Sequence, residues 1–247
     1  MEPWDRGIRR GVASPVSRVC KGRPVEVDYA IELGRDDETL EIPWVAPDGG
    51  RRYLDLKREP QALTRLEEAV RIPELHDFLS AINSQVSLLE SAKCDAWGTT
   101  EINPEEEIFG ASCKFTSYID LLFADEAPRT SFEHHEALAK KLCDLLHHVP
   151  EMAAAVELII RRCLYHLAGT IDQTNTHQKP NSLDQANTRE RKIDVGQESA
   201  RLHSWPTSGF YITAYVSGFG DNEKDASQCW NIALKLLQYA LVQLGNG

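Results

Sequence analysis

The spacing of apolar and polar residues predicts several β-strands in this chain. Residues 25–33 alternate between apolar and polar side chains, as a strand with one buried face does. Residues 40–57 contain two candidate strands on either side of Pro47-Asp48-Gly49-Gly50, and we interpret them as a β-hairpin. Further strands are predicted at the ranges 86–97, 115–124 and 209–219.

Helical spacing predicts helices between these strands. Apolar residues recur at helical intervals in the ranges 63–70, 75–82 and 130–149, and in a last helix that starts at Asp221 or Asn222. Pro73 separates the first two, because an interior proline removes a hydrogen bond and clashes with the preceding turn. Acidic residues in the first turn of the last helix suit the helix dipole.

Residues 153–167 fit a helix or a strand, and an internal resemblance favours the strand. Tyr53-Leu54-Asp55-Leu56 and Tyr118-Ile119-Asp120-Leu121 share a pattern, and each precedes a helix and a cysteine-containing segment. We interpret the ranges 51–97 and 114–166 as two copies of a strand–helix–strand unit. The second copy then makes 156–166 a strand.

The resulting order predicts an α+β fold. A hairpin is followed by two strand–helix–strand units and a strand–helix unit, which suits a mainly antiparallel sheet with helices packed on one face. We expect a ferredoxin-like layout with a duplicated β-α-β unit. Residues 24–247 would form one domain. The segment 1–23 is predicted to be a disordered basic leader, and the polar range 168–204 a disordered insertion.

Charge and cysteine content narrow the function classes. The chain has 247 residues and a net charge of −11. The segment 1–23 carries six Lys/Arg and two acids, a net +4, so the remainder carries −15. Such acidity argues against general binding to nucleic acid or anionic lipid and favours a protein partner with a basic surface. Six scattered cysteines and the lack of a secretory or membrane-spanning apolar segment predict a cytoplasmic protein.

Alternation along the predicted strands identifies a candidate binding surface. If helices cover one face of the sheet, tyrosines, two aspartates and a lysine line the other. These candidate residues are Tyr53, Asp55, Lys57, Tyr118, Asp120, Tyr211, Thr213 and Tyr215. They could bind a polar ligand or a protein, or they could form an ordinary solvated face, since Tyr and Thr are good strand formers.

Other sequence features give no chemistry of their own. Asp55 and Asp120 could act as a carboxylate pair, although we favour separate ion pairs for each. On the 130–149 helix we expect a buried His135 and two exposed histidines, His147 and His148, instead of a zinc site. Gly218-Phe219-Gly220 lacks the rest of a phosphate loop and is interpreted as a turn before the last helix. We predict no metal and no cofactor.

Three functional hypotheses follow from these patterns. The first is a non-catalytic protein-binding module that acts through its acidic surface or through the face of the sheet that the helices leave uncovered. The second is an enzyme that uses carboxylates and tyrosines on that face, with or without a divalent metal. The third is self-association through the same face, which would make a homo-oligomer.

Overall fold

A computed structural model describes residues 25–34, 39–46, 48–102, 110–148, 152–166 and 206–245. The predicted basic leader 1–23 and the predicted insertion 168–204 lie outside the described residues. The fold is α+β, with one mixed sheet of six strands and several helices.

Four of the strands pair antiparallel, and two pair parallel at one edge. In chain order they are β1 (Glu26–Glu32), β2 (Leu40–Ile42), β3 (Leu89–Thr99), β4 (Cys113–Phe123), β5 (Ala154–Tyr165) and β6 (Thr207–Gly220). Their spatial order is β1-β5-β6-β4-β3, with β2 also paired to β5. Both β1 and β2 run parallel to β5, whereas the β5–β6, β6–β4 and β4–β3 pairs are antiparallel.

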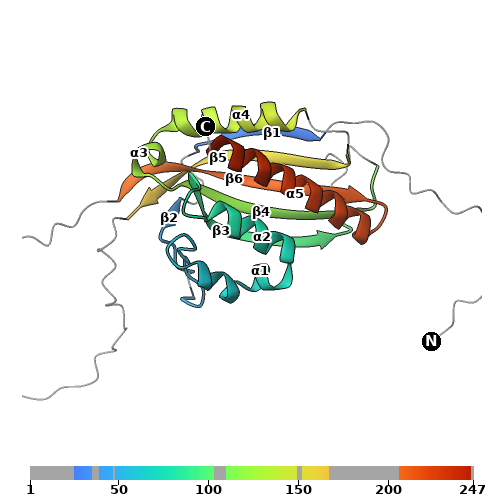
Figure 1. Cartoon of the computed structure of the whole chain (residues 1–247), viewed down its shortest axis with the longest axis horizontal. Helices are drawn as coiled ribbons and strands as arrows, with labels where there is room; N and C mark the ends of the chain where they lie inside the picture. The colour runs from blue at the N-terminus through green and yellow to red at the C-terminus, as the bar shows by residue number, and fades with distance from the viewer. Residues whose placement is uncertain are drawn as a thin grey trace, which may run out of the picture.

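Three helices share one apolar core with the central strands. The helical elements are η1 (Pro60–Arg65), α1 (Glu67–Arg71), α2 (Pro73–Ile82), α3 (Glu126–Arg129), α4 (Phe132–Leu146) and α5 (Glu223–Gly245). Buried side chains of α2, α4 and α5 form one cluster with those of β4, β5 and β6. Figure 1 shows α5 lying along the sheet between α4 and α2, with β1 at one edge and β3 near the other. Burial of this cluster is the main source of stability.

The long helix α5 packs unusually close to β6. A Cβ added at Gly218 would lie 2.1 Å from the backbone nitrogen of Trp230 on α5. The buried indole of Trp230 also donates a 2.9 Å hydrogen bond to the Ser117 hydroxyl on β4. Gly218-Phe219-Gly220 therefore belongs to β6 and serves helix–sheet packing, so its interpretation as a turn is wrong.

Most predicted elements are confirmed. The segment 153–167, which the pattern left between helix and strand, contains the strand β5. The strands predicted at 25–33, 86–97, 115–124 and 209–219 correspond to β1, β3, β4 and β6. His135 on α4 is buried, while His147 and His148, which follow the end of α4, are exposed, as expected.

The predicted hairpin over 40–57 forms only in part. Its first strand shortens to β2. The two halves of the predicted hairpin are joined by one isolated antiparallel bridge, between Val45 and Arg52. The predicted second strand is wrong, because the chain turns at Asp55. The Asp55 side chain accepts from the Arg58 amide at 2.9 Å, and its carbonyl accepts from the Glu59 amide at 2.8 Å. Local hydrogen bonding by an aspartate thus competes with strand pairing.

The finer architecture expected from the sequence is not confirmed. The sheet is mixed because β1 joins its edge parallel to β5. The first of the two proposed repeats lacks its opening strand, so neither the duplication nor the ferredoxin-like layout is confirmed. The placement of all helices on one face of the sheet is not confirmed either. In β4–α4–β5 the two strands lie on either side of β6 and run parallel to each other. None of the described helices is long and apolar enough to cross a bilayer.

Candidate functional site

The sheet presents a polar face on the side opposite the core shared by α2, α4 and α5. Strand register places five side chains in one row across the sheet, which we call the cross-strand row: Asp95 (β3), Tyr118 (β4), Tyr215 (β6), Glu157 (β5) and Asp28 (β1). Directly paired residues point to the same side of a sheet, so these side chains share the polar face. Two tyrosines therefore occupy the middle of the row and carboxylates its ends.

An aromatic strip crosses the polar face at this row. The Tyr118 ring lies 6.4 Å from the Trp97 ring in an edge-on arrangement and 6.2 Å from the Tyr215 ring. Trp97 keeps 42% of its surface exposed. Burial, together with the nearby acids, raises the pKa of Tyr118 to about 12. Its phenol is therefore a hydrogen-bond donor at neutral pH.

A chain of hydrogen bonds lies beside this strip. Arg161 on β5 contacts Glu32 at 2.8 Å and donates to the Thr213 hydroxyl at 3.0 Å. Thr213 donates in turn to the Asp120 carboxylate at 2.7 Å. Burial raises the pKa of Asp120 to about 6, while the Thr213 hydrogen bond and the positive charges of Lys93 and Arg161 oppose that rise. Asp120 is 6% exposed, so it belongs to an internal network beneath the polar face.

One end of the polar face is covered. Tyr211 is buried in a cluster with two residues of β2, the strand that pairs with β5 at this end of the sheet. The members of this cluster, here called the β2 cluster, are Leu40, Ile42, Leu122, Cys163, Tyr165 and Tyr211. Burial raises the pKa of Tyr211 to about 12. Tyr211 therefore contributes to packing within the protein and offers little surface to a ligand or partner.

The three candidates from the first half of the chain have structural partners. The Tyr53 hydroxyl donates to Glu90 at 3.3 Å, and Glu90 forms an ion pair with Arg129 at 2.7 Å. Asp55 opens the turn at 56–58 and accepts from the Arg58 amide within it. Lys57 donates to three backbone carbonyls, those of Ser84, Ser87 and Leu89, at 2.6 to 3.1 Å. Tyr53 and Lys57 therefore fasten the segment that carries them to the rest of the fold, and Asp55 stabilises a local turn.

The eight sequence candidates therefore divide into two groups. Tyr118, Asp120, Thr213 and Tyr215 come together on the polar face, with Tyr211 at its covered end. Tyr53, Asp55 and Lys57 do not join them, because the segment that carries them is not a strand. Asp55 and Asp120 share no hydrogen-bond partner among the described residues. The carboxylate pair suggested by the repeated pattern has no support in these contacts.

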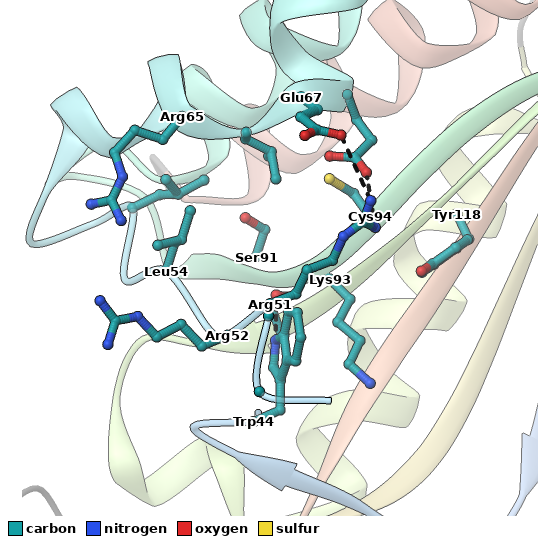
Figure 2. Close-up of a pocket in the computed structure, with 16 residues that line it drawn as sticks. Trp44, Arg51, Arg52, Leu54, Arg65, Glu67, Ser91, Lys93, Cys94 and Tyr118 are labelled. Atoms are coloured by element: carbon teal, nitrogen blue, oxygen red, sulfur yellow. Dashed lines mark hydrogen bonds and ion pairs between the residues drawn. The ribbon is translucent and has the colours of Figure 1, made fainter. Parts of the chain in front are cut away.

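A pocket next to the polar face escaped sequence reasoning. Its volume is about 690 Å³, and its walls come from Trp44 and the segment 49–56, from the end of η1 and the start of α1, from β3, and from Tyr118 on β4. Figure 2 shows Tyr118 at one end of this pocket and Arg52 and Arg65 at the other. The cationic side chains that line it are Arg51, Arg52, Arg65 and Lys93. The sequence offered only one sign of this pocket, the adjacent Arg51 and Arg52 after Asp48-Gly49-Gly50. Two neighbouring arginines after a turn show no helical or strand periodicity, so they did not indicate a site.

The available groups limit the chemistry of the site. Among the residues that the structure describes, no group of three His, Cys, Asp or Glu side chains is placed to hold a metal ion. Burial raises the pKa of Cys94, in the pocket wall, to about 12. Its thiol therefore stays protonated at neutral pH and is a poor nucleophile. The exposed side chains of the polar face and the pocket are mainly aromatic rings and charged groups.

Comparison with known proteins adds no family assignment. No protein-family model, curated protein or solved structure matched this chain.

Proposed function

We propose that this chain is a non-catalytic protein-binding module whose polar face takes a basic segment of a partner protein. The observation that carries the proposal is the cross-strand row, in which two tyrosines lie between carboxylates. Aromatic rings bind lysine and arginine through cation–π contacts, and carboxylates add ion pairs. The row offers both kinds of contact on one surface.

At the β5–β1 end of the row the charges are complementary to a basic segment, whereas Asp95 at the other end already pairs with Arg71 and Arg161 lies over the Tyr215 ring. Glu157 and Asp28 are exposed and have no ion-pair partner in the described part of the chain. They lie next to each other on β5 and β1, at one end of the row. The net charge of −11 would steer a basic partner towards the protein and slow the approach of an acidic one.

Binding of a short arginine-rich peptide, measured by calorimetry, tests the proposal. We expect affinity that falls with salt, because screening weakens exposed charges. Trp97→Thr and Glu157→Gln should each lower the affinity several-fold. A peptide with citrulline in place of arginine has the same shape without the charge, and it should bind weakly.

The matched control for Trp97→Thr is Tyr239→Thr on α5. Tyr239 is 66% exposed and lies on a helix away from the cross-strand row. The Tyr239→Thr substitution should therefore leave peptide binding unchanged. Equal binding by all variants, or equal binding of the arginine and citrulline peptides, would contradict the proposal. A homodimer in light scattering that Trp97→Thr dissociates would assign the face to a second copy of the chain instead.

An enzymatic role is the second candidate, and Asp120 is the observation that favours it. A carboxyl group whose pKa is about 6 can exchange a proton near neutral pH. Its low exposure and its hydrogen bond from Thr213 weigh against direct contact with a substrate. A screen for hydrolytic and isomerase activities, repeated on Asp120→Asn, tests this candidate. Turnover in the wild type that Asp120→Asn abolishes would favour the enzyme over the binding module.

A further inference from the structure

We propose that the pocket of about 690 Å³ beside β3 binds a small organic anion with a planar apolar body and a phosphate or carboxylate head. Such a site is separate from the protein-binding role proposed for the polar face. The volume lies within the range of small-molecule sites, which is roughly 300–1,000 Å³. Its walls combine apolar side chains with six charged ones, so the pocket is more polar than most small-molecule sites and suits a charged ligand.

The charge of the pocket is opposite to that of the protein. Four cationic side chains and two acidic ones, Glu67 and Glu68, line it, which gives 4 − 2 = +2 in a chain of net charge −11. Arg51 pairs with Glu67 at 3.7 Å and with Glu68 at 3.6 Å, so these two acids already have a partner. The remaining cations therefore supply the excess positive charge.

Two of these cations are available for a ligand. Arg52 and Arg65 are exposed and form no ion pair with any residue that the structure describes. Figure 2 shows both guanidinium groups at the end of the pocket away from Tyr118. Guanidinium groups bind phosphate and carboxylate through two parallel hydrogen bonds. We assign the anionic head of the ligand to this end.

The rest of the pocket suits an apolar body. Leu54, Leu56 and Leu66 line it, together with the Trp44 ring. The Trp44 indole donates a 3.0 Å hydrogen bond to the Ala92 carbonyl, which fixes the orientation of the ring. The Lys93 ammonium lies 4.9 Å from the centre of that ring. A planar ligand could pack against these side chains while its head reaches the arginines.

The walls are held in place without a ligand. Lys57 ties the segment that carries Trp44 and Leu54 to the end of α2 and the start of β3 through its three carbonyl contacts. The turn before Arg51 is closed by a 2.8 Å hydrogen bond from the Ala46 amide to the Arg51 carbonyl. Gly49 occupies this turn with φ of 72°, a conformation that favours glycine. A preformed site spends less binding free energy on ordering its own residues.

Calorimetric titration with naphthyl phosphate, naphthol, naphthoate and inorganic phosphate tests the proposal. We expect saturable binding of naphthyl phosphate and at least tenfold weaker binding of naphthol, which lacks the charge; one charged contact is worth roughly tenfold or more. Inorganic phosphate, which lacks the body, should also bind more weakly. Comparison of naphthoate with naphthyl phosphate distinguishes a carboxylate ligand from a phosphate ligand.

A charge-matched pair of double variants locates the site. Arg52→Gln with Arg65→Gln should weaken naphthyl phosphate at least tenfold. Arg58→Gln with Arg162→Gln removes the same charge from exposed positions outside the pocket and should preserve the affinity. No saturable binding, naphthol binding as tight as naphthyl phosphate, or equal losses in both double variants would each overturn the proposal. Neither double variant changes the cross-strand row, so failure here leaves the peptide test intact.

Discussion

The hydroxyl of Thr213 on β6 donates a 2.7 Å hydrogen bond to the carboxylate of Asp120, its direct partner on β4. The same hydroxyl oxygen accepts from Arg161 at 3.0 Å. A hydroxyl group has one proton, so the Arg161 contact leaves that proton to Asp120 and fixes its direction. The register of three strands thus sets the environment of one buried carboxyl group.

We predict that Asp120→Asn removes a pH dependence of stability. Burial raises the pKa of Asp120 to about 6 in the folded state, above its ordinary value. Between roughly pH 4 and pH 6 the folded protein therefore binds a proton that the unfolded chain has released, and stability falls as the pH rises through this window. Asparagine keeps an acceptor oxygen for Thr213 and does not titrate. Between pH 5 and pH 8 the wild type should lose about 1.4 kcal/mol of stability through this group, because only the last pH unit of the window is crossed, and Asp120→Asn should not show this loss in urea unfolding.

The control for this prediction is Asp221→Asn, directly after β6. Asp221 is exposed and forms no ion pair with any residue that the structure describes, so its substitution should leave the difference between pH 5 and pH 8 as in the wild type. If Asp120→Asn and the wild type instead lose stability in parallel as the pH rises, the Asp120 carboxyl group is not the source of the dependence.

We predict that Lys57→Met loosens the segment 44–58. Methionine preserves the apolar length of the side chain but cannot donate to the three carbonyls that Lys57 contacts. The loss should be about 1–3 kcal/mol, the cost of hydrogen bonds made by a charged group. Hydrogen exchange should also become faster at the amides of Leu56 and Glu59, which are bonded within this segment. Lys141→Met, at an exposed position on α4, should change neither quantity.

The sequence predicted those residues of the polar face whose placement depends only on alternation within one strand. Alternation along β4 and β6 placed Tyr118 and Asp120 on the same face as Thr213 and Tyr215, because one strand alone sets that parity. It could not show that Tyr118 and Tyr215 are direct neighbours, because register depends on contacts between distant segments. Nor could it show that β1 joins β5, since alternation does not choose a partner strand.

The first half of the chain shows why a repeated pattern can mislead. Tyr53-Leu54-Asp55-Leu56 resembles the β4 sequence, yet Asp55 begins a turn and Leu56 is buried against the core. A strand needs a partner, and no described strand pairs with this segment beyond the Val45–Arg52 bridge. The pocket was missed for a related reason. Its walls come from four separate parts of the chain, so no local spacing marks Arg52 and Arg65 as neighbours.

We predict that Gly218→Ala strongly destabilises the fold. The added methyl group would lie 2.1 Å from the Trp230 nitrogen and 2.3 Å from the Ala226 carbonyl oxygen, both in the backbone of α5. Relief requires α5 to move away from β6, so the cost should exceed about 3 kcal/mol, beyond the usual range for overpacking. Gly98→Ala on β3 is the matched control, because its nearest contact would be an ordinary 3.4 Å to Phe115. Equal unfolding midpoints in urea for the two variants would contradict the close packing of α5 on β6.

We predict that Arg129→Met costs about 3–5 kcal/mol, because the buried carboxylate of Glu90 loses its ion-pair partner and keeps only the 3.3 Å hydrogen bond from Tyr53. The two side chains are 23% and 10% exposed and lie 2.7 Å apart. Burial raises the pKa of Glu90 while Arg129 lowers it, so removal of Arg129 should raise that pKa further. The folded variant would then hold a proton that the unfolded chain releases, and its stability should fall more steeply with rising pH than that of the wild type.

A second substitution separates the charge from the other contacts of Arg129. In the Arg129→Met background, Glu90→Gln removes the unpaired charge and should recover part of the loss, with the larger recovery at pH 8 than at pH 5. Recovery should be incomplete, because Arg129 also donates to the backbone carbonyls of Phe123 at 2.6 Å and Ala124 at 3.0 Å. Urea unfolding of the single and double variants at pH 5 and pH 8 measures the stability lost in Arg129→Met and the part that Glu90→Gln recovers. A double variant as unstable as Arg129→Met at pH 8 would show that the carbonyl contacts, and not the Glu90 charge, account for the role of Arg129.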